Sequence, residues 1–197
     1  MTPPLHISDV VEPERQKYRD IWALPQYQEA PSPGLEFIDA FMTVVQPTAG
    51  ETLIDLGCGS GKAGLALAER GLDVTWMDLT DTALDPAIDR ARFIEAPIWS
   101  SPWRNMRSIG WNYGYCCDVL EHLPKEYTML AIERILRACA LSWFLIAHLP
   151  DEHGKLIGEA LHMTVEPFKW WLDRLSTLGT VIDARDLCGR GLFLVQR

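Results

Sequence analysis

The spacing of hydrophobic residues changes repeatedly along this chain, and the changes predict alternating strands and helices. Residues 141–149 form an almost continuous apolar run, which is typical of a strand covered on both faces of a sheet. Residues 123–140 instead place Ile132, Ile135 and Leu136 at helical spacing. Strands are predicted at residues 52–57, 72–79, 91–99, 111–119, 141–149, 180–187 and 192–196. Helices are predicted at residues 35–45, 62–70, 85–90 and 123–140, and finally at 165–178 with Thr164 as its cap.

This alternation predicts an α/β fold, with a doubly wound, seven-stranded, mostly parallel sheet and helices on both faces. The last two strands are close enough along the chain to form a hairpin, so the last strand is expected to be antiparallel. We expect one domain at residues 35–197, preceded by an N-terminal leader or cap segment at residues 1–34. Part of that leader is expected to be a short docked helix, because Tyr18, Ile21 and Trp22 share one helical face.

A glycine-rich stretch follows the first predicted strand, at the edge where sheets of this kind bind ligands. Residues 55–61 read D-x-G-x-G-x-G. A P-loop is excluded, because it needs G-x-x-x-x-G-K-[ST] and this chain has Leu56 and Ala63 at two of the required positions. A dinucleotide-binding loop remains an alternative, since the glycines from Gly59 to Gly64 spell G-x-G-x-x-G.

The acidic residue Asp55 bears on the choice between ligands. It lies on the predicted strand, two residues before the first glycine, and a buried carboxylate is costly unless it is paired. A pyrophosphate would be repelled by this charge. A sulfonium such as S-adenosylmethionine, which carries an ammonium group and no phosphate, would be attracted by it.

With these residues the sequence resembles the class I S-adenosylmethionine-dependent methyltransferases, over roughly residues 35–197. Asp55 and the glycines match the first motif of that family, and Asp78 matches the acidic residue that binds the ribose hydroxyls. Residues 116–124, CCDVLEHLP, resemble the fourth motif, and residues 161–171 resemble a segment that follows the fifth strand.

The resemblance implies S-adenosyl-L-methionine as cofactor and a set of residues that bind it. The third strand ends in residues 96–99, which depart from the polar pattern common in the family. The expected cofactor-binding residues are Asp55, Gly57, Gly59, Gly61, Asp78, Leu79, Ile98, Trp99 and Asp118. In the leader, Tyr27 and Ser32 are expected to close over the cofactor if the leader is a cover rather than a docked arm.

Methyl transfer from a sulfonium mainly requires alignment and a dry pocket. A base is needed only when the acceptor keeps its proton at neutral pH. The candidate catalytic residues are Asp118, His122, His148 and His162. Each also has a purely structural interpretation, as a residue bonded to backbone or as a polar side chain satisfied within the core.

Charge and sequence motifs limit the classes of methyl acceptor that this protein is expected to use. The formal net charge of −9 argues against binding to nucleic acid through phosphates. The DNA-methylating relatives of this fold carry [DNS]-P-P-[YF] where this chain has DVLE, and the Pro-Cys dipeptide of the cytosine enzymes does not occur. A small molecule or a protein side chain is therefore the expected acceptor. No oligomeric state is predicted.

The lengths of the apolar runs and the spacing of the cysteines indicate where the protein is located and whether it binds a metal. No apolar run approaches the roughly 18 residues needed to span a bilayer, and no secretory signal is recognisable, so no membrane association is expected. The five cysteines form no C-x-x-C pair, so no metal site is predicted, and a reducing, cytoplasmic location is expected.

Three alternatives remain at this point. An NAD-dependent oxidoreductase would share the layout, but Asp55 argues against it. A non-catalytic cofactor-binding relative would keep the glycines and lack turnover. An aminopropyl transferase would share the fold, but its usual pair of aspartates is not recognisable in the sequence.

Overall fold

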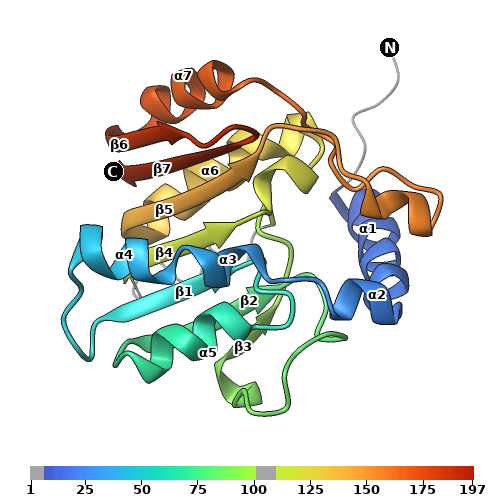
Figure 1. Cartoon of the computed structure of the whole chain (residues 1–197), viewed down its shortest axis with the longest axis horizontal. Helices are drawn as coiled ribbons and strands as arrows, with labels where there is room; N and C mark the ends of the chain where they lie inside the picture. Colours follow the sequence, from blue (N-terminus) through green and yellow to red (C-terminus); the bar gives the residue numbers. More distant parts are fainter. Residues whose placement is uncertain (1–6, 101–109) are drawn as a thin grey trace.

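The computed structural model describes residues 7–100 and 110–197. A seven-stranded sheet in the order β3-β2-β1-β4-β5-β7-β6 forms its centre (Figure 1). The strands are β1 Thr52–Leu56, β2 Asp73–Asp78, β3 Phe93–Glu95, β4 Trp111–Cys117, β5 Cys139–Ala147, β6 Thr180–Asp186 and β7 Arg190–Gln196. The α-helices are α1 Ile7–Trp22, α2 Pro25–Gln28, α3 Pro33–Glu36, α4 Ile38–Val45, α5 Lys62–Glu69, α6 Lys125–Ala138 and α7 Phe168–Leu178. Short 3₁₀ helices include η1 Arg90–Arg92, η3 Leu120–His122 and η4 His153–Leu156.

The pairing of the strands confirms the predicted fold class. β1 pairs in parallel with β2 and β4, β2 with β3, and β4 with β5. Only β7 runs the other way, pairing antiparallel with both β5 and β6. The short connection between β6 and β7 makes the predicted hairpin, and it places the last strand between two strands of opposite direction.

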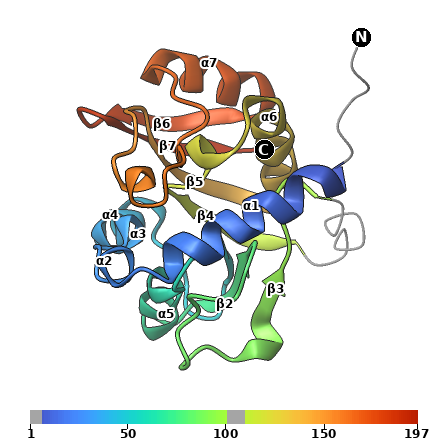
Figure 2. The same cartoon turned by 90° about the vertical axis from the view of Figure 1, so that its right-hand side faces the viewer.

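Two layers of helices cover the sheet. α3, α4 and α5 lie on one face, and α6 and α7 lie on the other (Figures 1 and 2). On the first face Phe41 and Leu67 are buried in one apolar cluster that also contains Trp143 of the sheet. On the second, Ile132 of α6 and Trp171 of α7 are fully buried. Among the described residues, no helix combines the length and the hydrophobicity that a membrane crossing requires.

The helix α1 lies across one end of the sheet rather than on either face (Figure 2). This end carries the carboxyl termini of the parallel strands, because Arg15 of α1 donates from Nε to the carbonyl of Leu79 at 3.0 Å, directly after β2. The helix spans 16 residues, which is longer than the short docked helix expected from the sequence.

Three predicted elements were wrong in extent. β3 ends at Glu95 instead of residue 99, because it is an edge strand paired only with β2 and Pro97 has no N–H to extend the pairing. Residues 85–89 form turns and bends rather than a helix, and only Arg90 belongs to the short η1. The Asp85 side chain accepts from the Ala87 N–H at 2.9 Å, which offers the backbone a non-helical partner, while Asp89 accepts from the Ala91 N–H and caps η1.

The last helix also begins later than predicted. Pro167 is the N-cap of α7, which starts at Phe168. Thr164 does not cap it. Its hydroxyl donates instead to the carbonyl of Leu123 at 2.7 Å, and this bond ties the segment before α7 to the end of η3.

Candidate functional site

The glycine loop joins β1 to α5 at the carboxyl edge of the sheet. Gly57 and Gly59 have φ angles of +67° and +54°, which side chains adopt only with strain. A Cβ at Gly57 would lie 2.5 Å from Cγ2 of Val119, and one at Gly59 would lie 2.8 Å from Cζ2 of Trp22. The loop is therefore packed between the segment after β4 on one side and α1 on the other.

Most N–H groups of this loop are already used inside the protein. Gly57 and Cys58 both donate to the carbonyl of Met77, at 2.8 and 3.0 Å. Gly59 donates to Oδ2 of Asp78 at 2.8 Å, and Gly61 donates to the carbonyl of Cys58 at 2.8 Å. A loop that holds a pyrophosphate offers these groups to the ligand. Here they hold the loop itself.

Asp78 ends β2 beside the loop. Its Oδ2 accepts from Gly59, and its Oδ1 accepts from the N–H of Thr80 at 3.3 Å. Burial raises the pKa of Asp78, and the backbone N–H donors partly offset that shift. Two donors leave acceptor capacity on a carboxylate, since each of its oxygens has two lone pairs. The remaining capacity suits hydroxyl donors.

Asp55 lies on β1 on the other side of the loop. Its side chain is buried, and its Oδ2 accepts from the N–H of Gly64 at 2.9 Å. Burial raises the pKa of Asp55 to about 7, the Gly64 N–H lowers it, and the nearby charge of Asp78 raises it further. A positive ligand group beside Asp55 would favour the ionised carboxylate.

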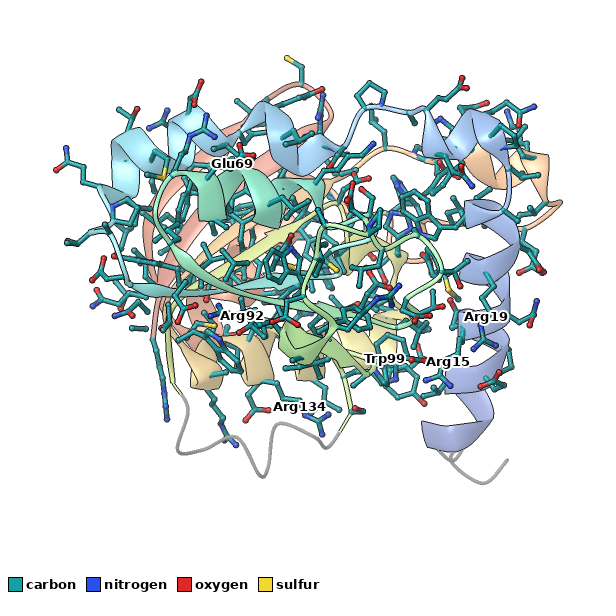
Figure 3. All side chains as sticks on the ribbon, turned by 90° about the horizontal axis from the view of Figure 1, so that it is seen from below. Arg15, Arg19, Glu69, Arg92, Trp99 and Arg134 are labelled. Atoms are coloured by element: carbon teal, nitrogen blue, oxygen red, sulfur yellow. The ribbon has the colours of Figure 1, made fainter. Side chains whose placement is uncertain are left out.

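Two adjoining pockets open around the loop. The first, of about 640 Å³, is lined by Gly57, Gly59, Asp78, Leu79, Ile98, Trp99 and Asp118 among others. Its apolar wall is fixed by Arg134 of α6, which donates to the backbone carbonyls of Trp99 and Ser100 (Figure 3). A cleft with an apolar wall and two carboxylates, Asp78 and Asp118, is typical of a small-molecule site.

The second pocket, of about 910 Å³, lies on the other side of Gly57 and Gly59. Its wall is more polar and includes Asp55, Asp118 and Asp151. Together with Asp78 of the first pocket, these carboxylates outnumber Lys62, the lysine of the second pocket's lining, and give the cleft a negative character, in keeping with the overall charge of −9. The histidines that line the second pocket are His122, His153 and His162.

Asp118 and His122 belong to both pockets and mark their junction. Nε2 of His122 lies 3.9 Å from Oδ2 of Asp118. Burial alone would raise the pKa of Asp118, but the neighbouring imidazole of His122 and the charges of His122 and His162 outweigh burial, so the pKa lies below its usual value. The rings of His122 and His162 are in edge-to-face contact, with centroids 4.6 Å apart.

His162 reaches the junction from a distant loop. The N–H groups of Met163 and Thr164 donate to the carbonyl of Glu121, at 2.8 and 2.9 Å, so this loop runs beside η3. Burial and the neighbouring His122 lower the pKa of His162. Glu121 is fully buried beneath the pair, and its Oε1 accepts from the N–H of Ala147. Burial and the charge of Asp118 hold the pKa of Glu121 well above its usual value.

The α1 helix and the segment after it cover both pockets. Trp22 and Tyr27 line both of them and meet edge to face, with ring centroids 4.7 Å apart. Tyr18 lines the first pocket, and its hydroxyl lies 2.8 Å from Nδ1 of His122. Ser32 lines the second pocket. We call residues 7–34 the cover.

The structure brings most of the predicted site residues together, with two exceptions. Gly61 lines neither pocket, and a Cβ there would meet Ile88 and Trp76, so this glycine serves close packing. His148 also lies outside both pockets, with Nε2 3.6 Å from Oδ1 of Asp186.

Sequence reasoning missed Tyr18 and Trp22 as lining residues, although their shared helical face was recognised. It also missed Asp151 and His153. Both follow β5, the strongest predicted strand, and a position just after a parallel strand is the signal that points to this edge of the sheet.

Comparison with known proteins finds methyltransferases, by sequence over part of the chain and by fold over most of it. No family model matches the chain. A stretch of 96 residues is 30% identical to the ubiquinone biosynthesis O-methyltransferase of Idiomarina loihiensis, covering 46% of this chain and 37% of that protein. The protein of the same name from Stutzerimonas stutzeri is 29% identical over 100 residues, covering 47% and 39%. The matched stretch thus spans less than half of either relative.

Solved structures share the fold over nearly the whole chain. The N-methyltransferase NodS from Bradyrhizobium japonicum, in complex with S-adenosylhomocysteine, superposes with a TM-score of 0.67 at 13% identity, covering 93% of this chain and 97% of that one. Magnesium protoporphyrin IX methyltransferase from Synechocystis, with the same molecule bound, gives 0.62 at 15%, covering 94% and 95%.

The fold is therefore that of the Rossmann-like methyltransferases. The sequence matches and the structural neighbours together confirm the resemblance to the class I S-adenosylmethionine-dependent methyltransferases.

Proposed function

We propose that this protein binds S-adenosyl-L-methionine and transfers its methyl group to a small molecule or a protein side chain. The observation that carries the proposal is the electrostatic character of the cleft. Carboxylates line it, and the N–H groups of the glycine loop are donated inward. Such a cleft favours a cationic ligand over a phosphate-bearing one.

The first pocket suits the nucleoside part of this cofactor. Asp78 has acceptor capacity left for the ribose hydroxyls, while Leu79, Ile98 and Trp99 offer an apolar wall to the adenine. Gly57 and Gly59 let the ligand approach the backbone between the two pockets.

The second pocket suits the amino-acid part and the acceptor. Asp55 is a buried carboxylate that gains a partner if the ammonium group lies beside it. When bound, the cofactor supplies a methyl carbon on a positively charged sulfur. Trp22 and Tyr27 of the cover line both pockets beside Asp118, and His122 and His162 line the proposed acceptor side.

The acceptor is proposed to be a small molecule or protein group rather than DNA. The net charge of −9 opposes a phosphate backbone, and Glu121 of the DVLE segment is buried as a structural residue. The named relatives act on small molecules by their names, which favours that class. The five cysteines are free thiols, consistent with the proposed cytoplasmic location.

Calorimetric titration of the purified protein with S-adenosylmethionine, S-adenosylhomocysteine and NAD tests the proposal. We expect micromolar binding of the first two and no heat from NAD. Binding of NAD alone would overturn the proposal in favour of an oxidoreductase. Binding of the first two without turnover on any hydroxyl, amine or thiol acceptor would favour the non-catalytic alternative.

A further inference from the structure

Three side chains of metal-binding type meet at the junction of the two pockets. They are Asp118, His122 and His162, and one potential ligand atom from each lies within 4.8 Å of the others. They come from two separate parts of the chain, the turn after β4 and the loop before α7. Two imidazoles and one carboxylate form a donor set that binds divalent transition metals.

The hydrogen bonds of the two imidazoles prepare Nε2 for a ligand role. Nδ1 of His162 lies 2.7 Å from the carbonyl of Leu149. A carbonyl can only accept, so Nδ1 carries the proton and Nε2 keeps its lone pair. Nδ1 of His122 lies 2.8 Å from the Tyr18 hydroxyl, which can accept in the same way. Metal-bound histidines are typically held by such an oxygen on the other nitrogen.

The surrounding backbone also orients the site. Asp118 has a φ of +61°, a left-handed conformation that is uncommon outside glycine. Its N–H donates to the carbonyl of Leu145 at 2.8 Å, which fixes the turn. Glu121 lies fully buried below, and its Oε2 has no hydrogen-bond partner among the described residues.

We propose that Asp118, His122 and His162 bind one divalent transition-metal ion, through the carboxylate and the Nε2 atoms of both histidines. Mg²⁺ prefers all-oxygen surroundings and is expected to bind more weakly than Zn²⁺ or Co²⁺. Three protein ligands leave coordination positions open toward the second pocket. That arrangement is typical of catalytic rather than structural metal sites.

A role for the ion rests on the proposed methyl transfer. We infer that it holds the oxygen of an acceptor hydroxyl, and that its charge makes loss of the hydroxyl proton to solvent easier at neutral pH. The oxygen then forms a bond to the methyl carbon while the carbon–sulfur bond breaks. Its electron pair returns to the sulfur, giving a methyl ether and a neutral thioether.

Titration of the full-length, EDTA-treated protein with Co²⁺ tests the site, with visible ligand-field absorption as the readout. We expect one saturable band, displaced by Zn²⁺ and not by an equal concentration of Mg²⁺. His162→Gln is expected to weaken Co²⁺ binding by at least about tenfold, as loss of a ligand or its support does. His148→Gln is the matched control, because His148 also lies beside a carboxylate but outside the cleft, and it should leave the band unchanged.

A folding defect is separated from loss of the site by measuring S-adenosylhomocysteine binding of His162→Gln. Preserved binding with a lost band supports the metal site. The absence of a saturable band in the wild-type protein, or equal loss in both variants, would overturn it. Because cofactor titration of the EDTA-treated protein is read independently, failure of the metal site and failure of the proposed function remain distinguishable.

The open coordination positions are tested with acetohydroxamate, a small ligand that binds metals through two oxygens. We expect it to shift the Co²⁺ band of the wild-type protein. A band that forms but does not shift would mean a closed, structural site, and it would overturn the inferred role in holding the acceptor.

Discussion

At the scale of single residues, Asp78 is proposed to bind the ribose hydroxyls of the cofactor through the carboxylate lone pairs that Gly59 and Thr80 leave free. Asp78→Ala is expected to weaken S-adenosylhomocysteine binding by about 1–3 kcal/mol, the loss of hydrogen bonds to a charged acceptor. Calorimetry measures this directly. Asp73→Ala serves as the control, because Asp73 begins the same strand at the opposite edge and pairs with Arg92. Equal affinity in the Asp78 variant and the wild type would refute the ribose role.

The buried carboxylate of Asp55 is expected to lower the stability of the folded protein when it is ionised and no ligand is bound. Its pKa is about 7 in the folded chain and about 4 in an unfolded one. The folded state therefore holds a proton that the unfolded state releases, so ionisation of Asp55 lowers the free energy of unfolding as pH rises from about 4 to about 7, with no further loss above.

Asp55→Asn is accordingly expected to be more stable than the wild type without ligand. The gain should be roughly 1–4 kcal/mol at pH 8 and smaller at pH 5, because one pKa unit corresponds to about 1.4 kcal/mol. Urea unfolding at both pH values measures it, and the exposed Asp39→Asn is the control. A gain that does not grow with pH would show that Asp55 is not the titrating group. The same variant should bind S-adenosylmethionine more weakly, since its ammonium group loses a charged partner.

At the scale of elements, the glycine loop depends on Gly57 for two separable reasons. Gly57 and Gly158 have similar φ angles, +67° and +73°, but a Cβ at Gly57 meets Val119 whereas one at Gly158 meets nothing within 4 Å. Gly158→Ala should therefore cost only the conformational strain, about 1–2 kcal/mol. Gly57→Ala should cost more and should also weaken cofactor binding, because Val119 lines the first pocket.

Urea unfolding of the two variants, with calorimetry of the cofactor complex, makes this comparison. Equal losses of stability would mean that Val119 yields without cost. Unaltered affinity in Gly57→Ala would mean that the loop is not the binding site.

The elements that sequence alone predicted are those whose signals are local. The spacing of hydrophobic residues predicted the alternation of strands and helices along the chain. The glycine loop was predictable because residues 55–61 contain its whole motif in one continuous stretch. The predicted end of β3 and the predicted start of α7 were wrong. Pro97 lacks the N–H that would extend β3, and the Thr164 hydroxyl bonds to Leu123, and the spacing of hydrophobic residues reports neither effect. The placing of the site residues followed from strand ends, where side chains of parallel strands gather.

What could not be predicted depends on contacts between distant parts of the chain. The Tyr18 hydroxyl and His122 are 104 positions apart. His162 reaches His122 only because Met163 and Thr164 hydrogen-bond to Glu121. The helical spacing predicts that Tyr18 is buried, but the residues near it in sequence do not indicate which part of the protein it packs against.

At the scale of the whole molecule, the cover contributes side chains to both pockets, so a bound cofactor is expected to contact it. We expect S-adenosylhomocysteine to slow amide hydrogen exchange in α1, because a filled pocket gives Tyr18 and Trp22 further packing partners. Exchange in β6, at the far edge of the sheet, should not change and serves as the internal control. Unchanged exchange in α1 upon saturation would contradict the covering role.

The inward hydrogen bonds of the glycine loop have a consequence for the thermodynamics of binding. A segment whose donors are already satisfied is ordered before any ligand arrives, so the ligand does not have to supply the entropy of fixing it. The entropic cost of ordering is then expected to fall on the cover, residues 7–34, whose side chains line both pockets, and the loop should contribute shape at almost no entropic cost.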